Sequence, residues 1–114
     1  MNRSVLLQLT RDSIEEVLQA KRSIKKQTLL QKHPLLEQKV KVTINISIDD
    51  ELLHSYENQG ELALIDAIII GAKKAAFERS TPLTISQYLH CEIELILDTP
   101  QGVISQKDPP IFEN

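Results

Sequence analysis

Residues 40–48 alternate strictly between apolar and polar side chains, and this pattern constrains the fold more than any other feature. A period of two, with β-branched residues on one side, is typical of a strand that buries one face and leaves the other in water. Such a strand requires an antiparallel sheet with one solvated face. The apolar positions are Val40, Val42, Ile44, Ile46 and Ile48.

A second alternating segment, at 90–98, predicts another strand of the same sheet. One of its faces carries acidic residues together with Ile96. Thr99-Pro100 ends this strand, and residues 101–105 predict a short edge strand. The remaining residues contain two prolines and predict an extended tail over 106–114. The other face is apolar and consists of Cys91, Ile93, Leu95 and Leu97.

The pair Asp49-Asp50 follows the first strand and predicts a turn. Residues 51–56 then return as the second arm of a hairpin. The adjacent leucines Leu52 and Leu53 leave a short helix as the alternative at this point. Asn58-Gln59-Gly60 ends the unit.

Residues 4–21 have helical spacing, with apolar residues on one side and Arg11 among the charged residues of the other. We expect an amphipathic surface helix that docks by one face. Asn2 or Ser4 offers the side-chain oxygen of an N-cap.

Residues 61–78 predict a second, strongly apolar helix, since apolar residues fill more than half of its helical wheel. Gly71 lies inside the apolar arc, where it allows close approach to a sheet. Farther along, Thr84-Ile85-Ser86-Gln87 fits a capping box and predicts a short helical turn to about Leu89. The fold class is therefore α+β, a single domain with the apolar helix packed across an antiparallel sheet.

The apolar residues Ile70 and Phe77 interrupt the polar side of the second helix, so something must cover them. We expect the segment 21–39 to fold back over this helix, which makes the protein a monomer rather than a homodimer. A partner chain is the alternative cover. The covering residues of the segment would be Leu29, Leu30, Leu35 and Leu36.

The segment 21–39 is also the most basic part of the chain, and Pro34 should end any helix in it before His33. It is either a patch for an anionic ligand or nucleic acid, or a solvated linker. We favour the linker, because no glycine-rich loop or aromatic residue accompanies the charges. The basic residues are Lys21, Arg22, Lys25, Lys26 and Lys32.

Composition narrows the function classes. The 114 residues suffice for one domain, and their net charge of −3 argues against a nucleic-acid binder, which needs a basic face. One cysteine cannot form an internal disulfide, and no stretch approaches the roughly 18 apolar residues of a membrane helix. The apolar run at the start is too short for a signal peptide. We expect a cytoplasmic protein that makes no membrane contact.

The residue types that carry chemistry do not form a recognisable motif. The histidines are far apart with no paired spacing, so we predict no metal site. Cys91 occupies an inward strand position and is interpreted as a core residue rather than a nucleophile. Glu92 and Glu94 lie on one face of the second strand, and we interpret them as part of the solvent-exposed face of the sheet, which has to be polar. No phosphate loop, dinucleotide fingerprint or nucleophile elbow is present, so no cofactor is expected. The histidines are His33, His54 and His90.

Three motifs, in order along the chain, resemble the AMMECR-type domain family. The stretch Leu-Leu-Gln-Leu-Thr-Arg-Asp-Ser-Ile-Glu at 6–15 looks like the family's opening helix. Ala-Ala-Phe at 75–77 followed by Pro-Leu-Thr at 82–84 is similar to a second family motif. Glu-Ile-Glu at 92–94, in a strand that ends with Thr-Pro at 99–100, resembles a third. Together the motifs span an AMMECR-like core at about 5–105.

The resemblance implies an α+β domain with an antiparallel sheet, whose activity is not established. Such domains in prokaryotes are associated with a Memo-like protein and a radical S-adenosylmethionine protein, and a role in modifying RNA or protein has been suggested. The family's Leu-Arg-Gly-Cys-Ile-Gly arm should fall near 52–57, where this chain has Leu-Leu-His-Ser-Tyr-Glu. Only the leucine remains, so no family site residue can be carried over to the hairpin. The chain is also short for the family.

We therefore expect an AMMECR-like accessory or binding protein without independent catalysis. The alternative is a small enzyme, or a subunit acting with Memo-like and radical S-adenosylmethionine proteins in the modification of RNA or protein. Any polar site should lie between the hairpin and the loop at Pro82. A deep pocket that holds two of its residues would favour catalysis, and a flat surface would favour binding. The candidate residues are His54, Ser55, Tyr56 and Arg79.

Overall fold

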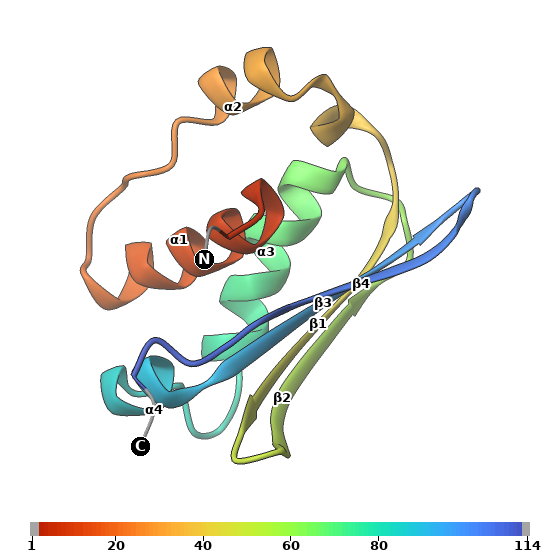
Figure 1. Cartoon of the computed structure of the whole chain (residues 1–114). Helices are drawn as coiled ribbons and strands as arrows, with labels where there is room; N and C mark the ends of the chain where they lie inside the picture. Colours follow the sequence, from red (N-terminus) through yellow and green to blue (C-terminus); the bar gives the residue numbers. More distant parts are fainter. Residues whose placement is uncertain (1–2, 113–114) are drawn as a thin grey trace.

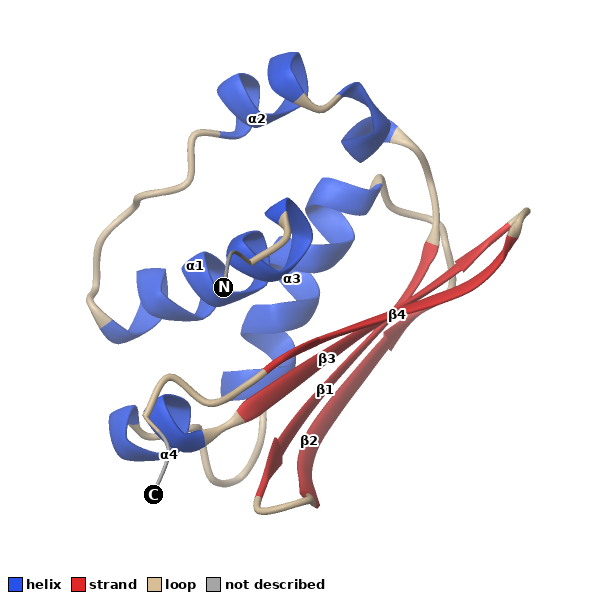
Figure 2. Cartoon of the chain, in the orientation of Figure 1, coloured by secondary structure: helices blue, strands red, loops and turns tan. Residues whose placement is uncertain are grey.

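A computed structural model describes residues 3–112 and has helices on one face of a four-stranded antiparallel sheet, while the other face is uncovered by helices (Figures 1 and 2). The α+β fold is thus confirmed. Within this range, no helix is both long and apolar enough to span a bilayer. The helices are α1 (Val5–Leu18), α2 (Lys26–Lys32), the 3₁₀ helix η1 (Pro34–Glu37), α3 (Leu64–Phe77) and α4 (Ile85–His90). The strands are β1 (Lys41–Ile48), β2 (Glu51–Asn58), β3 (Glu92–Thr99) and β4 (Gly102–Asp108).

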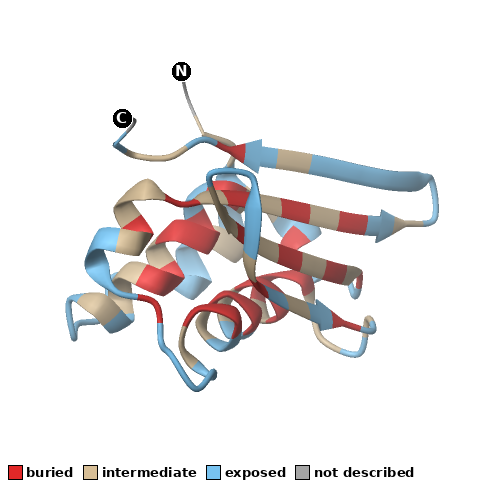
Figure 3. Ribbon diagram, turned by 90° about the horizontal axis from the view of Figure 1, so that it is seen from below, coloured by how far each residue is buried: buried red, intermediate tan, exposed pale blue. Residues whose placement is uncertain are grey.

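The sheet has the strand order β2-β1-β3-β4, and the two alternating segments predicted from the sequence are its central strands. Val42 pairs with Leu97, and Ile44 pairs with Leu95, so the apolar positions of β1 and β3 meet on the helix-facing side. Figure 3 shows the result as alternating buried and intermediate stripes along these strands. Ile48, at the end of the pattern, is only half-buried.

A tight hairpin joins β1 to β2, as predicted, and the alternative of a short helix at Leu52-Leu53 is wrong. Asp49 and Asp50 both have positive φ angles, 51° and 64°. Two consecutive left-handed residues are what a two-residue hairpin turn requires, because this geometry matches the twist of the strands. The register shifts between Ile46 and Ser47, which leaves Leu53 as the extra residue of a bulge in β2.

The edge strand predicted at 101–105 is present and longer than expected. β4 continues to Asp108, so the tail that was expected from residue 106 begins only after the strand. Beyond it, the backbone N–H of Phe112 donates to Leu89 O at 2.9 Å, which ties this segment to α4. The part of the predicted tail at 113–114 lies outside the described residues.

The apolar helix α3 packs across the inner face of the sheet, and Gly71 makes the close approach that the sequence indicates. A Cβ atom at this position would lie 2.7 Å from Tyr56 Cδ2 and 3.1 Å from Ile44 Cδ1. The buried side of the helix carries further small residues, Ala67, Ala72, Ala75 and Ala76. Helix and sheet therefore pack closely along this side of α3.

The second side of α3 is covered chiefly by α1, which lies along it (Figure 1). The segment 21–39 contributes at the N-terminal end of α3, where Leu64 N–H donates to Gln38 O at 2.7 Å. Of its leucines, Leu36 is buried, whereas Leu35 is 69% exposed. Ile70 itself remains 39% exposed, so the predicted cover is incomplete.

Helix α1 begins as predicted, since Ser4 Oγ accepts a hydrogen bond from Leu7 N–H. The prediction that α1 docks by one face, with Arg11 in solvent, is wrong. Arg11 is fully buried, and Val17 is 45% exposed. The reason is that α1 has α3 on one side and the end of β4 on the other, so residues on two of its sides are covered.

The short helix α4 begins, and α2 ends, at the positions that the sequence predicts. Thr84 and Gln87 form the predicted capping box, with each side chain bonded to the other residue's backbone N–H. Helix α2 stops at Lys32, directly before the His33-Pro34 step. Lys26 Nζ lies 2.6 Å from Asp66 Oδ1, an ion pair that joins α2 to α3.

Candidate functional site

The four candidate residues, three on β2 and Arg79 after α3, do not share one site. Ser55 lies on the outer face of the sheet, where its Oγ donates to Asn45 Oδ1 at 2.7 Å. Tyr56 lies on the inner face, where its ring occupies the space beside Gly71 of α3. His54 is buried on the same inner face, opposite Ile46, and Arg79 is exposed after the end of α3.

His54 and Arg79 are the pair that the structure brings near one another. Burial lowers the pKa of His54, and the positive charge of Arg79 lowers it further. Among the described residues, His54 Nδ1 has no hydrogen-bond partner. None of the four candidates lines any of the grooves described below.

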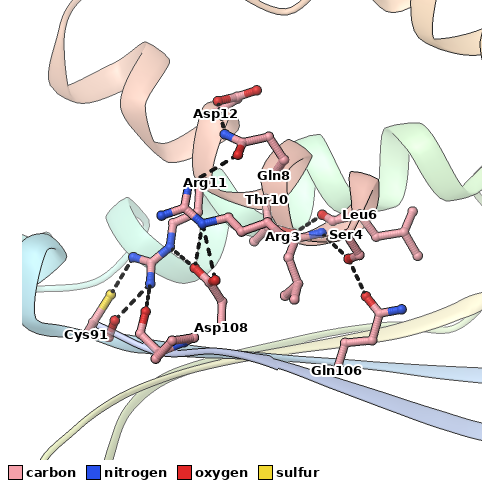
Figure 4. A network of polar contacts seen from close by, with 12 residues as sticks. Arg3, Ser4, Leu6, Gln8, Thr10, Arg11, Asp12, Cys91, Gln106 and Asp108 are labelled. Atoms are coloured by element: carbon pink, nitrogen blue, oxygen red, sulfur yellow. Dashed lines mark hydrogen bonds and ion pairs between the residues drawn. The ribbon is translucent and has the colours of Figure 1, made fainter. Parts of the chain in front are cut away.

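A buried cluster centred on Arg11 joins α1, the end of β4 and the start of β3 (Figure 4). Arg11 Nε donates to Asp108 Oδ2 at 2.6 Å, and Arg3 Nε lies 3.1 Å from the same oxygen. Arg11 Nη2 donates to the backbone oxygens of Cys91 and Pro109, each at 3.0 Å. Arg11 Nη1 donates to Tyr88 O at 3.4 Å. All three nitrogens of the guanidinium group are therefore bonded within the chain, and the cluster holds α1 in position.

The protonation states in this cluster follow from its burial. Burial alone would lower the pKa of Arg11, but the bond to Asp108 outweighs it and the net direction is upward. Burial raises the pKa of the Cys91 thiol, despite the nearby guanidinium, as expected for the core residue predicted from its strand position. Burial also raises the pKa of Tyr88, whose hydroxyl donates to Glu15 Oε2.

A second set of polar contacts, centred on Glu16 of α1, joins the segment 21–39 to α1 and α3. Glu16 Oε2 accepts from the backbone N–H groups of Ser23 and Ile24 at 2.8 and 2.9 Å. Its Oε1 accepts from Lys73 Nζ at 2.9 Å. Burial would raise the pKa of Glu16, but these bonds together lower it to about 2.

The principal concave surface is an apolar groove between the start of α1, the 3₁₀ helix η1 and the β3–β4 hairpin, which we call the α1–η1 groove. Its volume is about 870 Å³. Several of its apolar side chains are well exposed, notably Leu35 at 69% and Ile104 at 47%. Its lining residues are Val5, Leu6, His33, Leu35, Leu36, Gln38, Lys39, Val40, Leu64, Leu97, Thr99, Pro100, Gln101 and Ile104.

The ionisable side chains that line the α1–η1 groove are all basic. Among the described residues that line it, Lys39 and His33 can carry positive charge and no carboxylate is present. A smaller groove of about 320 Å³ shares Val5 and His33 with it, and its further charged lining residues are Arg3, Lys32 and one carboxylate, Asp12. The surface therefore suits an apolar occupant with acidic flanks.

The α1–η1 groove is not predictable from local patterns, because its lining comes from four separate segments, each ordinary by itself. The one signal for it in the sequence is the leucine content of 21–39, which we interpreted wholly as the cover of the second helix. Within residues 3–112, no three His, Cys, Asp or Glu side chains lie close enough together to hold a metal ion.

Comparisons with known proteins show the fold alone. No protein-family model matches the chain, and no curated protein is significantly similar to it. A crystal structure of an uncharacterised protein from Pyrococcus horikoshii is similar, with a TM-score of 0.71, 21% sequence identity and coverage of 83% of this chain. The match covers 50% of that protein, so the chain spans about half the length of the structure it resembles.

Proposed function

We propose that this chain is a cytoplasmic, AMMECR-like accessory protein that binds a partner protein in the α1–η1 groove. One observation carries the proposal: the groove is open and apolar, and residues that line it leave large apolar side chains in water. Leu35 and Ile104 are the most exposed of these, together with Val5 at 37%. Apolar groups gathered around a concave surface with a polar rim are typical of protein-interaction sites.

The separation of the polar candidates supports a binding role. Ser55 and His54 face opposite sides of the sheet, and Arg11, the most completely bonded polar residue, is internal. A catalytic site needs a base, a nucleophile or an acid within hydrogen-bond reach of one substrate position. The residues predicted for that role meet no such position in the grooves described.

The resemblance of the three motifs to the AMMECR-type family supplies the partners to test. These are a Memo-like protein and a radical S-adenosylmethionine protein from the same organism. The experiment is a titration of each purified candidate with the full chain, and isothermal calorimetry measures the binding. We expect a dissociation constant in the micromolar range with one of them.

Two matched variants assign the binding to the groove. Leu35→Asp places a negative charge on the groove and should weaken binding at least tenfold, about 1.4 kcal/mol. Leu52→Asp changes a leucine of similar exposure, 59%, on the distant β2 strand and should leave binding unchanged. Equal effects of the two substitutions, or no binding of either candidate protein by the wild type, would contradict the proposal.

A further inference from the structure

His54 is a buried ionisable residue that takes no part in the α1–η1 groove. Its exposed fraction is 6%, and it lies on the inner face of the sheet, opposite Ile46 of β1. Among the described residues, its Nδ1 atom has no hydrogen-bond partner. Buried polar groups are normally hydrogen-bonded, because an unpaired one loses its contacts with water and gains none in return. An apolar residue at this position would avoid that cost.

The surroundings of His54 favour its neutral form. Ile46, directly opposite on β1, is apolar and fully buried, and Tyr56, two residues along β2 on the same face, is uncharged as a phenol. The charged group that acts on the ring is Arg79, which follows the end of α3 and repels a second positive charge. Among the described residues, no carboxylate offsets this repulsion. A proton on the buried ring would therefore be unfavourable.

The β1–β2 hairpin is weakly attached beyond His54. The register shifts between Ile46 and Ser47, so Leu53, the residue directly before His54, is the extra residue of the bulge. Strand β3 pairs with β1 only as far as Ser47. The residues past this point, 48–53, form what we call the hairpin tip. Its contacts with the core are made by Ile48 and Leu53, which are both half-buried.

We propose that His54 is a pH-sensitive switch that controls whether the hairpin tip stays packed on the core. The neutral imidazole remains in the interior and holds the start of β2 in place. When Nδ1 takes up a proton from water, the charged ring moves out to solvent, the pairing at the bulge opens, and Ile48 and Leu53 become exposed. Histidine is the residue type whose charge ordinarily changes between about pH 5 and 8, so the switch acts just below neutral pH.

The direction of the pH dependence follows from the two states of the hairpin. In the open state the ring of His54 is in water and has the ordinary pKa of 6.5, whereas burial and Arg79 lower its pKa in the closed state. The open state therefore binds protons first as the pH falls, and its population rises. Each pH unit below 6.5 should increase the opening constant by up to about tenfold, until the closed state is also protonated.

Amide hydrogen exchange in the full chain tests the switch. Exchange is followed by NMR at pH 7.5 and 5.0, and each rate is divided by the rate expected for an unfolded chain at the same pH. We expect the protection of the hydrogen-bonded amides at 48–54 to fall by at least about fivefold at the lower pH. Protection of the amides in β3 should change less than twofold. The ring signals of His54 in the same samples give its pKa.

Three variants assign the effect to His54. His54→Phe keeps a ring of similar size that cannot be protonated, so the loss of protection at pH 5.0 should disappear. His33→Phe removes an imidazole beside η1 and should keep the wild-type loss. Arg79→Gln removes the repelling charge at an exposed position, so the pKa of His54 should rise and the loss of protection should become smaller. This variant tests the switch even if His54→Phe fails to fold.

Several outcomes would overturn the switch. One is equal protection of the hairpin tip at the two pH values, and another is an undiminished loss in His54→Phe. An equal loss in β3 would show that acid unfolds the whole chain rather than the tip. A His54 pKa that does not rise in Arg79→Gln would also count against it. The proposed function is judged separately by the Leu35→Asp titration, because His54 lines none of the grooves described.

Discussion

Arg11 and Asp108 are 97 positions apart in the chain, yet Arg11 Nε lies 2.6 Å from Asp108 Oδ2 in the interior. The ion pair joins the first helix to the last strand. A buried charge without its partner costs several kcal/mol, so each of these residues depends on the other.

Removing one member of this pair should be strongly destabilising. We expect Arg11→Met to lower the free energy of unfolding by about 3–5 kcal/mol, because Asp108 loses its buried partner and retains only Arg3. The measurement is urea unfolding followed by circular dichroism. Arg22→Met, at an exposed position, is the control and should change stability by less than about 0.5 kcal/mol. A similar small loss for both variants would show that the pair contributes little.

The contribution of Glu16 to the free energy of unfolding should be lost over a defined range of acidic pH. Its pKa is about 2 in the folded chain, below the ordinary value of 4.5, so the unfolded chain binds a proton first as the pH falls. The stability that Glu16 contributes is therefore present above about pH 4.5 and is lost between pH 4.5 and 2.

The variant Glu16→Gln isolates this contribution from those of the other carboxyl groups. It should lower stability by about 1–3 kcal/mol at pH 7, since charge-assisted hydrogen bonds are replaced by neutral ones. The difference from the wild type should vanish near pH 2. Glu51→Gln, at an exposed residue, should show no such convergence. A constant difference across this range, in urea unfolding at several pH values, would contradict the assignment.

Substitution of Gly71 should be costly because of one neighbour. In Gly71→Ala the new methyl group would lie 2.7 Å from Tyr56 Cδ2, so the ring or the helix must move. We expect a loss of about 1–3 kcal/mol, measured by thermal unfolding. Tyr56→Leu removes the ring, and in that background Gly71→Ala should cost less than about 1 kcal/mol. Equal costs in the two backgrounds would place the strain elsewhere.

Cys91 should be unreactive in the folded protein. It is fully buried, and burial raises the pKa of its thiol, so both access and thiolate content are low. We expect labelling by a disulfide reagent to be at least 100-fold slower in the native state than in denaturing urea. Native labelling at the unfolded rate would remove the structural interpretation and support a role as nucleophile.

Phe77 should matter for stability, and Ile70 should matter much less. Phe77 is half-buried and packs against the core, whereas Ile70 is 39% exposed. We expect Phe77→Glu to destabilise the chain by more than about 2 kcal/mol, and Ile70→Glu by less than about 1 kcal/mol. Light scattering after size-exclusion chromatography should give the mass of a monomer for the wild type. A dimer that Ile70→Glu converts to a stable monomer would show that a second chain covers α3.

The sequence predicts the local elements of this fold well because each has a local cause. The alternation at 40–48, the Asp49-Asp50 turn and the Thr84 capping box depend on neighbouring residues only, and each is present in the structure. The position of Arg11 has a different origin. On a helical wheel Arg11 belongs to the charged side of α1, and only the arrival of Asp108 makes its burial favourable.

The candidate site was harder to predict for the same reason. His54, Ser55 and Tyr56 are consecutive, and in a strand consecutive side chains cannot face one cleft. The α1–η1 groove joins Val5, Leu35 and Ile104, which lie far apart in the chain. The pattern of each segment indicates which residues are apolar, but the meeting of these residues depends on tertiary packing.

The pairing of Arg11 with Asp108 also has a consequence for folding during synthesis. The chain emerges from its N-terminus, so α1 is synthesised long before β4. Arg11 has no carboxylate to accompany it into the interior until residue 108 has emerged. We therefore expect docking of α1 to be a late step, and during synthesis the apolar face of α3 that α1 later covers should stay open to solvent or to chaperones. A circular permutant that places β4 directly before α1 would bring the two charges together early and shorten that exposure.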